Sequence, residues 1–372
     1  MKNIKPWIKA VGFMAGLAII LGVCDYLFAQ TGYVRYIIHE EKKGGYDTLI
    51  VGASHCRGAI DPQILDEKLG TNSLNVAIPG ESIQDSYFLI KDAAKNNDIK
   101  TVIFDLDYQY WYYEQPTTHF TKSFIYQQFT DPLLKLEYMA KNFDVLDMRN
   151  VIVNRLSWNM SVSGVKRNVS VKTSEAYKNY TIESAYDENG FVEGADGPYV
   201  GKGFFYRGGT EQGKLPPGED YVATWVNRYD DEIDPAVKKI FNDVVDFCKS
   251  NNIELICVTS PIPPTVTKTL GMSTVHDTMT QYFVDECGLE YYDFNKALMS
   301  SVPRDDCDYG DQEGHMGGQL AEVYSEALAK LLYDRNNGGV DENKYFYATF
   351  EEMYKNMKQD YTKETGNEWK GL

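Results

Sequence analysis

Two residues that could together cleave or form an ester lie near opposite ends of this 372-residue chain: Ser54 and His315. A serine hydroxyl is a poor nucleophile until a base removes its proton, and a histidine base needs a carboxylate that fixes its tautomer. Only proximity in the fold matters to this chemistry. The sequence therefore predicts Ser54 as nucleophile and His315 as general base. The alternative is that Ser54 only caps or turns the chain.

The carboxylate that would orient His315 has two candidates in the acidic loop before it, Asp311 and Asp308. Glu313 is a weaker choice, because a residue two positions from the histidine needs an unusual turn to reach its ring. His55 is expected either to line the site or to serve as a satisfied structural histidine.

The elements that must position these residues alternate between strand and helix. Apolar runs of strand type occupy residues 46–52, 73–77, 101–104, 253–258 and 289–292. Helix starts are signalled at Asp61-Pro62, at Ser82 with Asp85, at Asp234-Pro235 and at Gln319. This alternation predicts an α/β fold with a doubly wound, flavodoxin-like, mainly parallel five-stranded sheet. Ser54 follows the first strand, where such sheets expose catalytic groups.

A long insertion, residues 108–230, interrupts this pattern and is rich in Tyr, Asn and Gly. We expect it to cap the sheet edge and to serve substrate access or partner contact. Its aromatic run from Tyr108 to Tyr113, with His119, could stack on sugar rings or fill a core. The polar tail, residues 336–372, holds aromatic residues and should pack back on the domain of residues 31–335.

The first 30 residues carry lysines at positions 2, 5 and 9, followed by an uncharged apolar stretch. This is typical of a signal peptide or a signal anchor. Cleavage before Gln30 would put the bulky Leu27 at a position that favours small residues. We therefore expect a retained single-pass anchor in the cell membrane, with a cytoplasmic N-terminus and an extracellular C-terminal domain.

Composition excludes several classes of function. A net charge of −17 and the absence of a basic stripe argue against binding to nucleic acid. The five histidines are scattered, and no metal or organic cofactor is predicted. The six cysteines lack paired spacing, although a bridge between Cys287 and Cys307 is a candidate.

The segment Val51-Gly52-Ala53-Ser54-His55, followed by Arg57, Gly58, Ile60, Asp61 and Pro62, resembles the SGNH/GDSL hydrolase family. Residues 44–107 and 231–335 carry the resemblance. In particular it looks like the membrane-anchored branch that modifies surface polymers, which resembles the D-alanine transfer proteins of teichoic acid modification and the alginate acetylation acyltransferases.

The resemblance implies that the amides of Ser54 and Gly80 face the oxyanion. Three family features are altered, and one of them is that Gly317 and Gly318 replace the polar residue that usually follows the histidine. Gln312 stands where the family's Asp-x-x-His pair has its aspartate, which leaves Asp311 displaced by one residue. The family's Gly-x-Asn-Asp block is replaced by residues 104–108, so that Asp107 would line the site, with Asp308 as a second acidic candidate.

The expected function is a membrane-anchored serine acyltransferase or esterase. It would act on O-acyl groups of a cell-envelope glycan or teichoic-type polymer, with a membrane O-acyltransferase as partner. The alternative is a catalytically degenerate SGNH-like protein that binds glycan or scaffolds an acylation complex.

Overall fold

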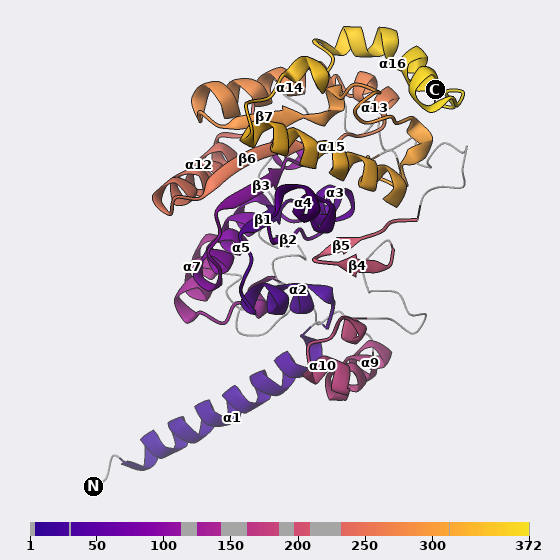
Figure 1. Cartoon of the computed structure of the whole chain (residues 1–372). Coiled ribbons are helices and arrows are strands. Elements are labelled where there is room, and N and C mark those ends of the chain that lie inside the picture. The colour runs from indigo at the N-terminus through magenta and orange to yellow at the C-terminus, as the bar shows by residue number, and fades with distance from the viewer. Residues whose placement is uncertain are drawn as a thin grey trace. The chain divides into compact units, whose positions relative to one another are not determined.

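The computed structural model describes residues 4–29, 31–112, 125–142, 162–185, 197–208, 232–311 and 313–371. The chain divides into two compact units. One contains Met1–His39 and Pro116–Glu193, and the other contains Glu40–Gln115 and Gly194–Leu372. Figure 1 labels their helices and strands.

A five-stranded parallel sheet forms the centre of the second unit. Its strands are β1 (Thr48–Val51), β2 (Ser73–Asn75), β3 (Thr101–Asp105), β6 (Glu254–Thr259) and β7 (Glu290–Asp293), in the order β2-β1-β3-β6-β7. The predicted five-stranded parallel sheet is confirmed, with strand ends within two residues of the expected ones. β1 and β2 are fully buried, and β3 is buried except for Thr101 at its start.

Three helices between these strands begin where the capping residues predict: α4 (Pro62–Leu69), α5 (Ile83–Asn96) and α12 (Pro235–Ser250). After the last strand, α15 (Gly318–Asn336) begins one residue before the expected start at Gln319 and has no side-chain cap. The Asp61 side chain accepts from the Gln63 amide, and the Asp234 side chain accepts from the Ala236 amide. Ser82 and Asp85 form a reciprocal capping box, which satisfies two amides at the start of α5.

Helices cover both faces of the sheet. Ile103 belongs to the core cluster that α15 contributes to, together with its strand neighbours Ile50 and Ile256. The next side chain, Phe104, has its ring centroid 5.5 Å from that of Phe241 on α12. Because successive strand residues point to opposite faces, α15 and α12 lie on opposite sides of the sheet. Figure 1 shows α15 beside α4, and α12 follows the other face with α5.

The C-terminal part of this unit adds α13 (Pro264–Thr269), α14 (Met272–Thr280), a π-helical turn (Gln281–Glu286) and α16 (Phe350–Thr365). Short 3₁₀ turns occupy Tyr108–Tyr110, Phe294–Lys296, Asp306–Asp308 and Glu342–Lys344. In the tail, Tyr345, Phe346, Tyr347 and Phe350 are all buried. All six cysteines lie in the described residues and all are thiols, so the candidate bridge between Cys287 and Cys307 is not formed.

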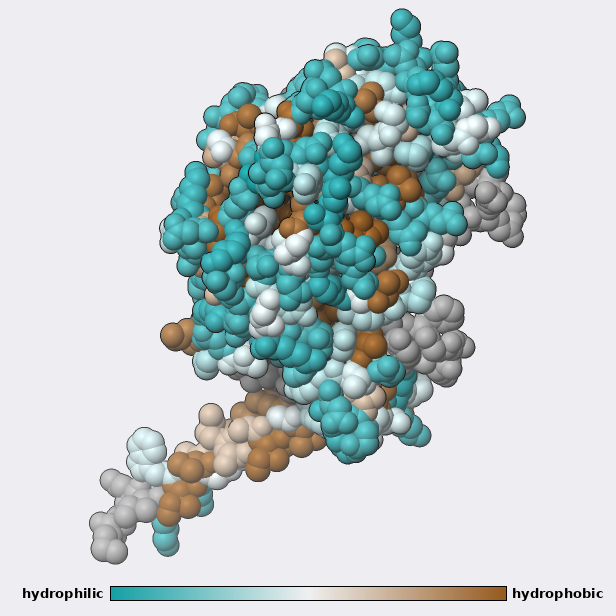
Figure 2. Space-filling model, viewed as in Figure 1, coloured by the Kyte–Doolittle hydropathy of each residue, from teal (hydrophilic) through white to brown (hydrophobic). Residues whose placement is uncertain are grey.

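The first unit is helical in its described residues. It contains α1 (Ile4–Phe28), α2 (Tyr33–Lys42, which ends in the second unit), α7 (Pro132–Asn142), α9 (Val162–Thr173), α10 (Glu175–Lys178) and the 3₁₀ turn Ile182–Ala185. Residues Lys5–Phe28 form a helix long and apolar enough to cross a membrane. Figure 2 shows apolar side chains over its surface.

The end of α1 is held by side chains of α9. Asn168 donates to the carbonyls of Leu27 and Ala29, at 3.0 and 2.8 Å, and the Lys172 ammonium donates to the Ala29 carbonyl at 2.6 Å. The last carbonyls of a helix lack partners within the helix, so these donors satisfy them. These hydrogen bonds fasten the end of the apolar helix to α9 in the same unit.

Candidate active site

Ser54 is the first residue of a short helix, α3 (Ser54–Ala59), that begins directly after β1. The intervening Gly52 has φ +155°, and a Cβ there would lie 2.7 Å from the Cβ of Cys56 and 2.8 Å from the carbonyl oxygen of Asp105. Only glycine allows the chain to pass this close to β3 and turn at once. The sequence did not predict α3, because six residues that include a glycine carry too little helical periodicity to stand out.

This turn lies at the carboxyl edge of the sheet. The chain moves from β1 outward to β2 and then returns to β3 on the other side of β1. The order of strands therefore reverses between β1 and β3, which is where open α/β sheets leave a crevice for ligands. Ser54 stands beside that crevice.

His315 lies in a closed loop immediately before α15. Tyr309 and Met316 form an antiparallel bridge, and the Gly310 amide donates to the His315 carbonyl at 2.8 Å. Gly314 has φ +109°, and a Cβ there would lie 2.3 Å from Cγ2 of Ile262. The loop can approach the segment after β6 this closely only because residue 314 is a glycine, and this fixes the position of His315.

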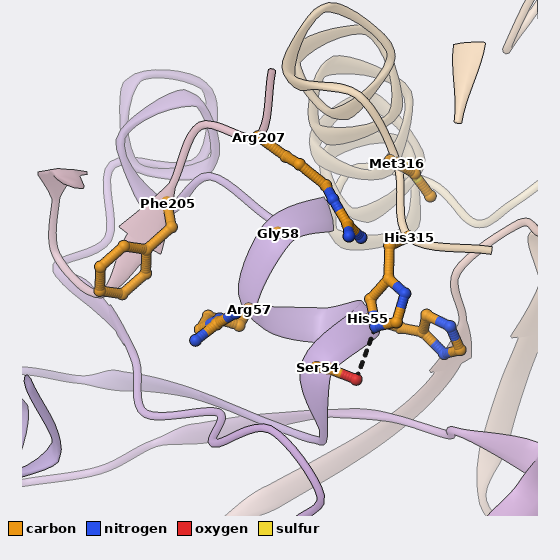
Figure 3. Close-up of a pocket in the computed structure, with 8 residues that line it drawn as sticks. All are labelled: Ser54, His55, Arg57, Gly58, Phe205, Arg207, His315 and Met316. Atoms are coloured by element: carbon orange, nitrogen blue, oxygen red, sulfur yellow. Dashed lines mark hydrogen bonds between the residues drawn. The ribbon is translucent and has the colours of Figure 1, made fainter. Parts of the chain in front are cut away.

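Ser54, His315 and Asp311 form one chain of hydrogen bonds. His315 Nε2 lies 2.8 Å from Ser54 Oγ, across a separation of 261 residues (Figure 3). On the other side of the ring, His315 Nδ1 lies 2.9 Å from Asp311 Oδ2 and 3.0 Å from Oδ1. This is the arrangement of nucleophile, base and orienting carboxylate that activates a serine.

Asp311 is further held by groups around its carboxylate. The amides of Gly314 and His315 each donate to Oδ1 at 3.2 Å, and Arg207 Nη2 lies 3.1 Å from Oδ2. Burial opposes ionisation of this carboxyl, but the hydrogen bonds and charges of His315 and Arg207 outweigh it and hold the pKa of Asp311 well below its usual range. Asp311 is therefore held as a carboxylate beside the His315 ring.

The pKa of His315 is lowered. Burial is the main cause, and the charge of His55 adds to it, while the hydrogen bond and charge of Asp311 act in the opposite direction. A neutral imidazole with its proton on Nδ1, facing Asp311, leaves Nε2 free to accept the proton of Ser54.

The other two carboxylates considered as orienting groups lie elsewhere. Asp308 accepts from the Asp305 amide at 2.8 Å and caps the 3₁₀ turn Asp306–Asp308. Glu313 Oε2 is 3.9 Å from His315 Nδ1, beyond hydrogen-bonding distance. Of the three acidic residues, Asp311 is the one at the ring, and it reaches His315 from four positions back.

His55 and Asp107 meet beside this triad. His55 Nδ1 lies 3.2 Å from Asp107 Oδ2, and the ring centroids of His55 and His315 are 4.6 Å apart. Asp105, two residues before Asp107, turns away and accepts from the Ser260 amide at 3.0 Å and from its hydroxyl. Only one of these two aspartates therefore faces a histidine.

Gly80 lies in the turn that follows β2, with φ +72°. The Ile78 amide in this turn donates to the Gly52 carbonyl at 3.3 Å and to the Glu81 carboxylate at 2.9 Å. The turn is thus tied to the residue that leads into Ser54, on the same edge of the sheet.

In comparison with known proteins, the sequence matches no family model and no curated protein. The geometry of the site is therefore what bears on its function.

The triad opens into a small pocket. Its lining residues are Ser54, His55, Arg57, Gly58, Phe205, Arg207, His315 and Met316 (Figure 3). Figure 3 shows Arg207 reaching toward His315 from the chain segment above it, and His55 lying next to His315. The pocket places the Ser54 hydroxyl near the cationic side chains of Arg57 and Arg207, in a protein that is strongly acidic overall.

Phe205 and Arg207 are site residues that the sequence did not indicate. Phe205 ends β5 (Phe204–Phe205), which forms a hairpin with β4 (Tyr199–Gly201) within the insertion, and Arg207 follows two residues later. The Gly318 amide donates to the Arg207 carbonyl at 2.8 Å, which fastens this segment to the start of α15. The pair of glycines at 201 and 203, with two phenylalanines after them, was the one available signal of a hairpin here.

The aromatic run of the insertion has a packing role where the structure describes it. Trp111 is 1% exposed, and its ring centroid lies 4.9 Å from those of Phe241 and Phe283. Tyr113, His119 and Gln312 lie outside the described residues. Within the described part of the chain, no group of three or more His, Cys, Asp or Glu is arranged to hold a metal ion.

Proposed function

We propose that this protein is a serine acyltransferase or esterase in which Ser54 carries the acyl group. The observation that supports this most is the continuous chain of hydrogen bonds from Ser54 through His315 to Asp311, at 2.8 and 2.9 Å. Packing in a core does not require that a histidine nitrogen lie at hydrogen-bonding distance from a serine hydroxyl that lines a pocket.

The proposed reaction proceeds in two halves. Ser54 Oγ attacks the carbonyl carbon of an acyl ester while His315 Nε2 takes the hydroxyl proton. The tetrahedral intermediate expels the donor alcohol, to which His315 returns that proton, and an ester on Ser54 remains. An acceptor hydroxyl, or water, then attacks this ester while His315 takes its proton, and His315 returns that proton to Ser54 Oγ as the acyl group leaves the serine.

The amides of Ser54 and Gly80 are the proposed donors to the oxyanion. Both belong to turns at the carboxyl edge of the sheet that are tied together through Gly52. Each oxyanion donor in enzymes of this kind is worth about 10²- to 10³-fold in rate.

The topology agrees with an SGNH-type, doubly wound fold. Numbered by their order in the chain, the five strands lie in the order 2-1-3-4-5, which is the order of flavodoxin-like sheets. A nucleophile after the first strand and a base just before α15 follow the family's arrangement. This supports carrying the family's ester chemistry over to Ser54 and His315.

The proposed setting is the cell membrane, with α1 as a single-pass anchor and the catalytic unit outside. The acceptor would be a cell-envelope glycan or teichoic-type polymer, and the donor side a membrane O-acyltransferase. We rank transfer above hydrolysis, because an esterase that scavenges soluble esters gains nothing from an anchor. The resemblance and the apolar helix Lys5–Phe28 support this setting.

The test is covalent labelling of the full chain in detergent with a fluorophosphonate probe. Wild type should be labelled at Ser54, Ser54→Ala should lose at least about 10³-fold in labelling rate, and Ser250→Ala, an exposed serine at the end of α12, should match wild type. Wild type that resists labelling would overturn the proposal in favour of a binding or scaffold protein.

A second assay separates transfer from hydrolysis. In this assay, wild-type protein without fluorophosphonate treatment is supplied with an activated acetyl ester. It should transfer the acetyl group to a glycan hydroxyl faster than to water. Release of acetate at the same rate with and without the glycan would favour a plain esterase.

A further inference from the structure

A second histidine–aspartate pair, which the proposed reaction does not use, lies against the base. The side chains of His55 and Asp107 are 6% and 3% exposed, and the two atoms that join them are 3.2 Å apart. His55 also lines the pocket, with its ring centroid 4.6 Å from that of His315. Burying two charges costs free energy unless the charges stabilise each other or act on a third group, so the pair calls for a structural or functional explanation.

The surroundings of His55 favour its charged form. Burial opposes the charge, but the carboxylates of Asp107, Asp311 and Asp105 together outweigh it, with Asp107 the main contributor, and raise the pKa of His55 to about 9. The second ring nitrogen, Nε2, is buried and makes no hydrogen bond to the described residues. His55 is therefore compensated by a carboxylate on one side only.

Several charged groups in the described residues lie around His315, and Arg57 lines the same pocket. The Asp311 carboxylate favours a second proton on its ring, and Glu313, at 3.9 Å from Nδ1, adds to this. The guanidinium of Arg207, which is bound to the same Asp311 carboxylate, opposes that proton, as does His55. Protonation of His315 would place two imidazolium rings with centroids 4.6 Å apart in a largely buried site.

We propose that His55, held in its charged form by Asp107, is a positioning residue that keeps His315 neutral and so extends its use as a base to lower pH. The inference rests on the proposed function. A protonated His315 has no lone pair for the proton of Ser54, so the rate falls tenfold for each pH unit below the pKa of His315.

The experiment follows the pH dependence of the labelling rate in wild type, His55→Gln, His55→Lys and Asp107→Asn. The acid limb is the part of the pH profile in which the labelling rate falls as His315 becomes protonated. His55→Gln removes the charge and should move the acid limb to higher pH by about one unit. At a pH below the limbs of both proteins, the variant should be labelled about tenfold more slowly than wild type. Asp107→Asn should move the limb in the same direction, because His55 then loses its proton more easily. His55→Lys restores a cation and should return the limb toward that of wild type.

The matched control is His276→Gln, which alters a histidine of another His–Asp pair outside the pocket and should leave the acid limb unchanged. A wild-type limb in His55→Gln overturns the inference. So does a limb in His55→Lys that shifts as far as in His55→Gln, because shape and not charge would then be responsible.

A second measurement does not depend on catalysis. The chain has five histidines, so the ring carbons of ¹³C-histidine-labelled protein can be followed by NMR as pH changes. The His315 signal should titrate at higher pH in His55→Gln than in wild type, and an unchanged titration overturns the inference. If wild type is not labelled by the probe, the proposed function fails, and this titration still decides the role of His55.

Discussion

The second unit contains two histidines that are bound to an aspartate through Nδ1 at the same distance, 2.9 Å: His315 with Asp311, and His276 with Asp293. Each also has a hydroxyl near Nε2. For His315 the hydroxyl is that of Ser54, at 2.8 Å, and for His276 it is that of Thr280, at 3.5 Å.

The two pairs differ in what supplies the hydroxyl and in what surrounds the carboxylate. Thr280 lies one helical turn along α14 from His276, so its position follows from the helix alone. Ser54 comes from the other end of the chain. The other oxygen of Asp293 accepts from the amide and the side chain of Asn295, both at 2.9 Å, whereas Asp311 accepts from the amides that shape the loop around His315.

The comparison shows that a His–Asp pair alone does not define an active site. Chemistry requires a hydroxyl at hydrogen-bonding distance, a pocket in front of it and a histidine that stays neutral. The site around Ser54 combines the three, whereas the pair on α14 fastens a helix to the end of β7.

The largest difference is expected between the labelling rates of His315→Gln and His276→Gln. His315→Gln should lower the rate of fluorophosphonate labelling by at least about 10³-fold, because Ser54 loses its base. His276→Gln should leave that rate unchanged and lower the free energy of unfolding by about 1–2 kcal/mol, through loss of a partly buried hydrogen bond. A labelling loss of similar size in both variants would contradict the assignment of the base.

Asp311→Asn is expected to have the next largest effect. An amide no longer fixes the tautomer of His315, so the labelling rate should fall by about 10²- to 10⁴-fold. Asp308→Asn is the control, because its side-chain oxygen can still accept from the Asp305 amide. If labelling falls as far in Asp308→Asn, the orienting carboxylate has been misassigned.

Glycines that precede each histidine offer a third contrast. Gly314→Ala places a Cβ 2.3 Å from Ile262 Cγ2 at φ +109° and should displace His315, with a loss of about 10- to 100-fold in labelling rate. Gly271, the N-cap of the helix that carries His276, has φ +65°, and a Cβ added there would meet no atom within 4 Å outside the adjoining chain. Gly271→Ala should therefore cost only about 1 kcal/mol of backbone strain and leave labelling intact.

The last prediction concerns stability as a function of pH, with no change expected in the labelling chemistry itself. Because the pKa of His55 is about 9 in the folded protein, its contribution to the free energy of unfolding is fully present below about 6.5 and is lost as pH rises through about 9. The difference corresponds to on the order of 3 kcal/mol at most. Denaturant unfolding at about pH 6.5 and about pH 9.5 should show this loss in wild type and a smaller one in His55→Gln. An equal loss in both proteins would show that His55 is neutral in the folded state.

The sequence by itself determined the strands, most helix starts and the two residues at the centre of the site. Apolar runs bounded by glycines and capping residues are local signals, and Asp61, Ser82 and Asp234 each cap the helix that follows them. Ser54 follows the first strand, and His315 precedes α15. These two positions could be recognised from the sequence because the topology, and not detailed packing, brings them to one edge of the sheet.

Only the tertiary structure decided which carboxylate orients His315, where His55 and Asp107 meet, and that Arg207 and Phe205 enter the pocket. Asp308 and Asp311 are both aspartates in the loop before His315, so the sequence cannot distinguish which of them contacts the ring. The structure distinguishes them because the loop closes through the bridge between Tyr309 and Met316. Contacts of this kind join residues far apart in the chain, or depend on φ angles at single glycines. Local residue patterns carry no information about either, because both are set by how the packed elements approach one another.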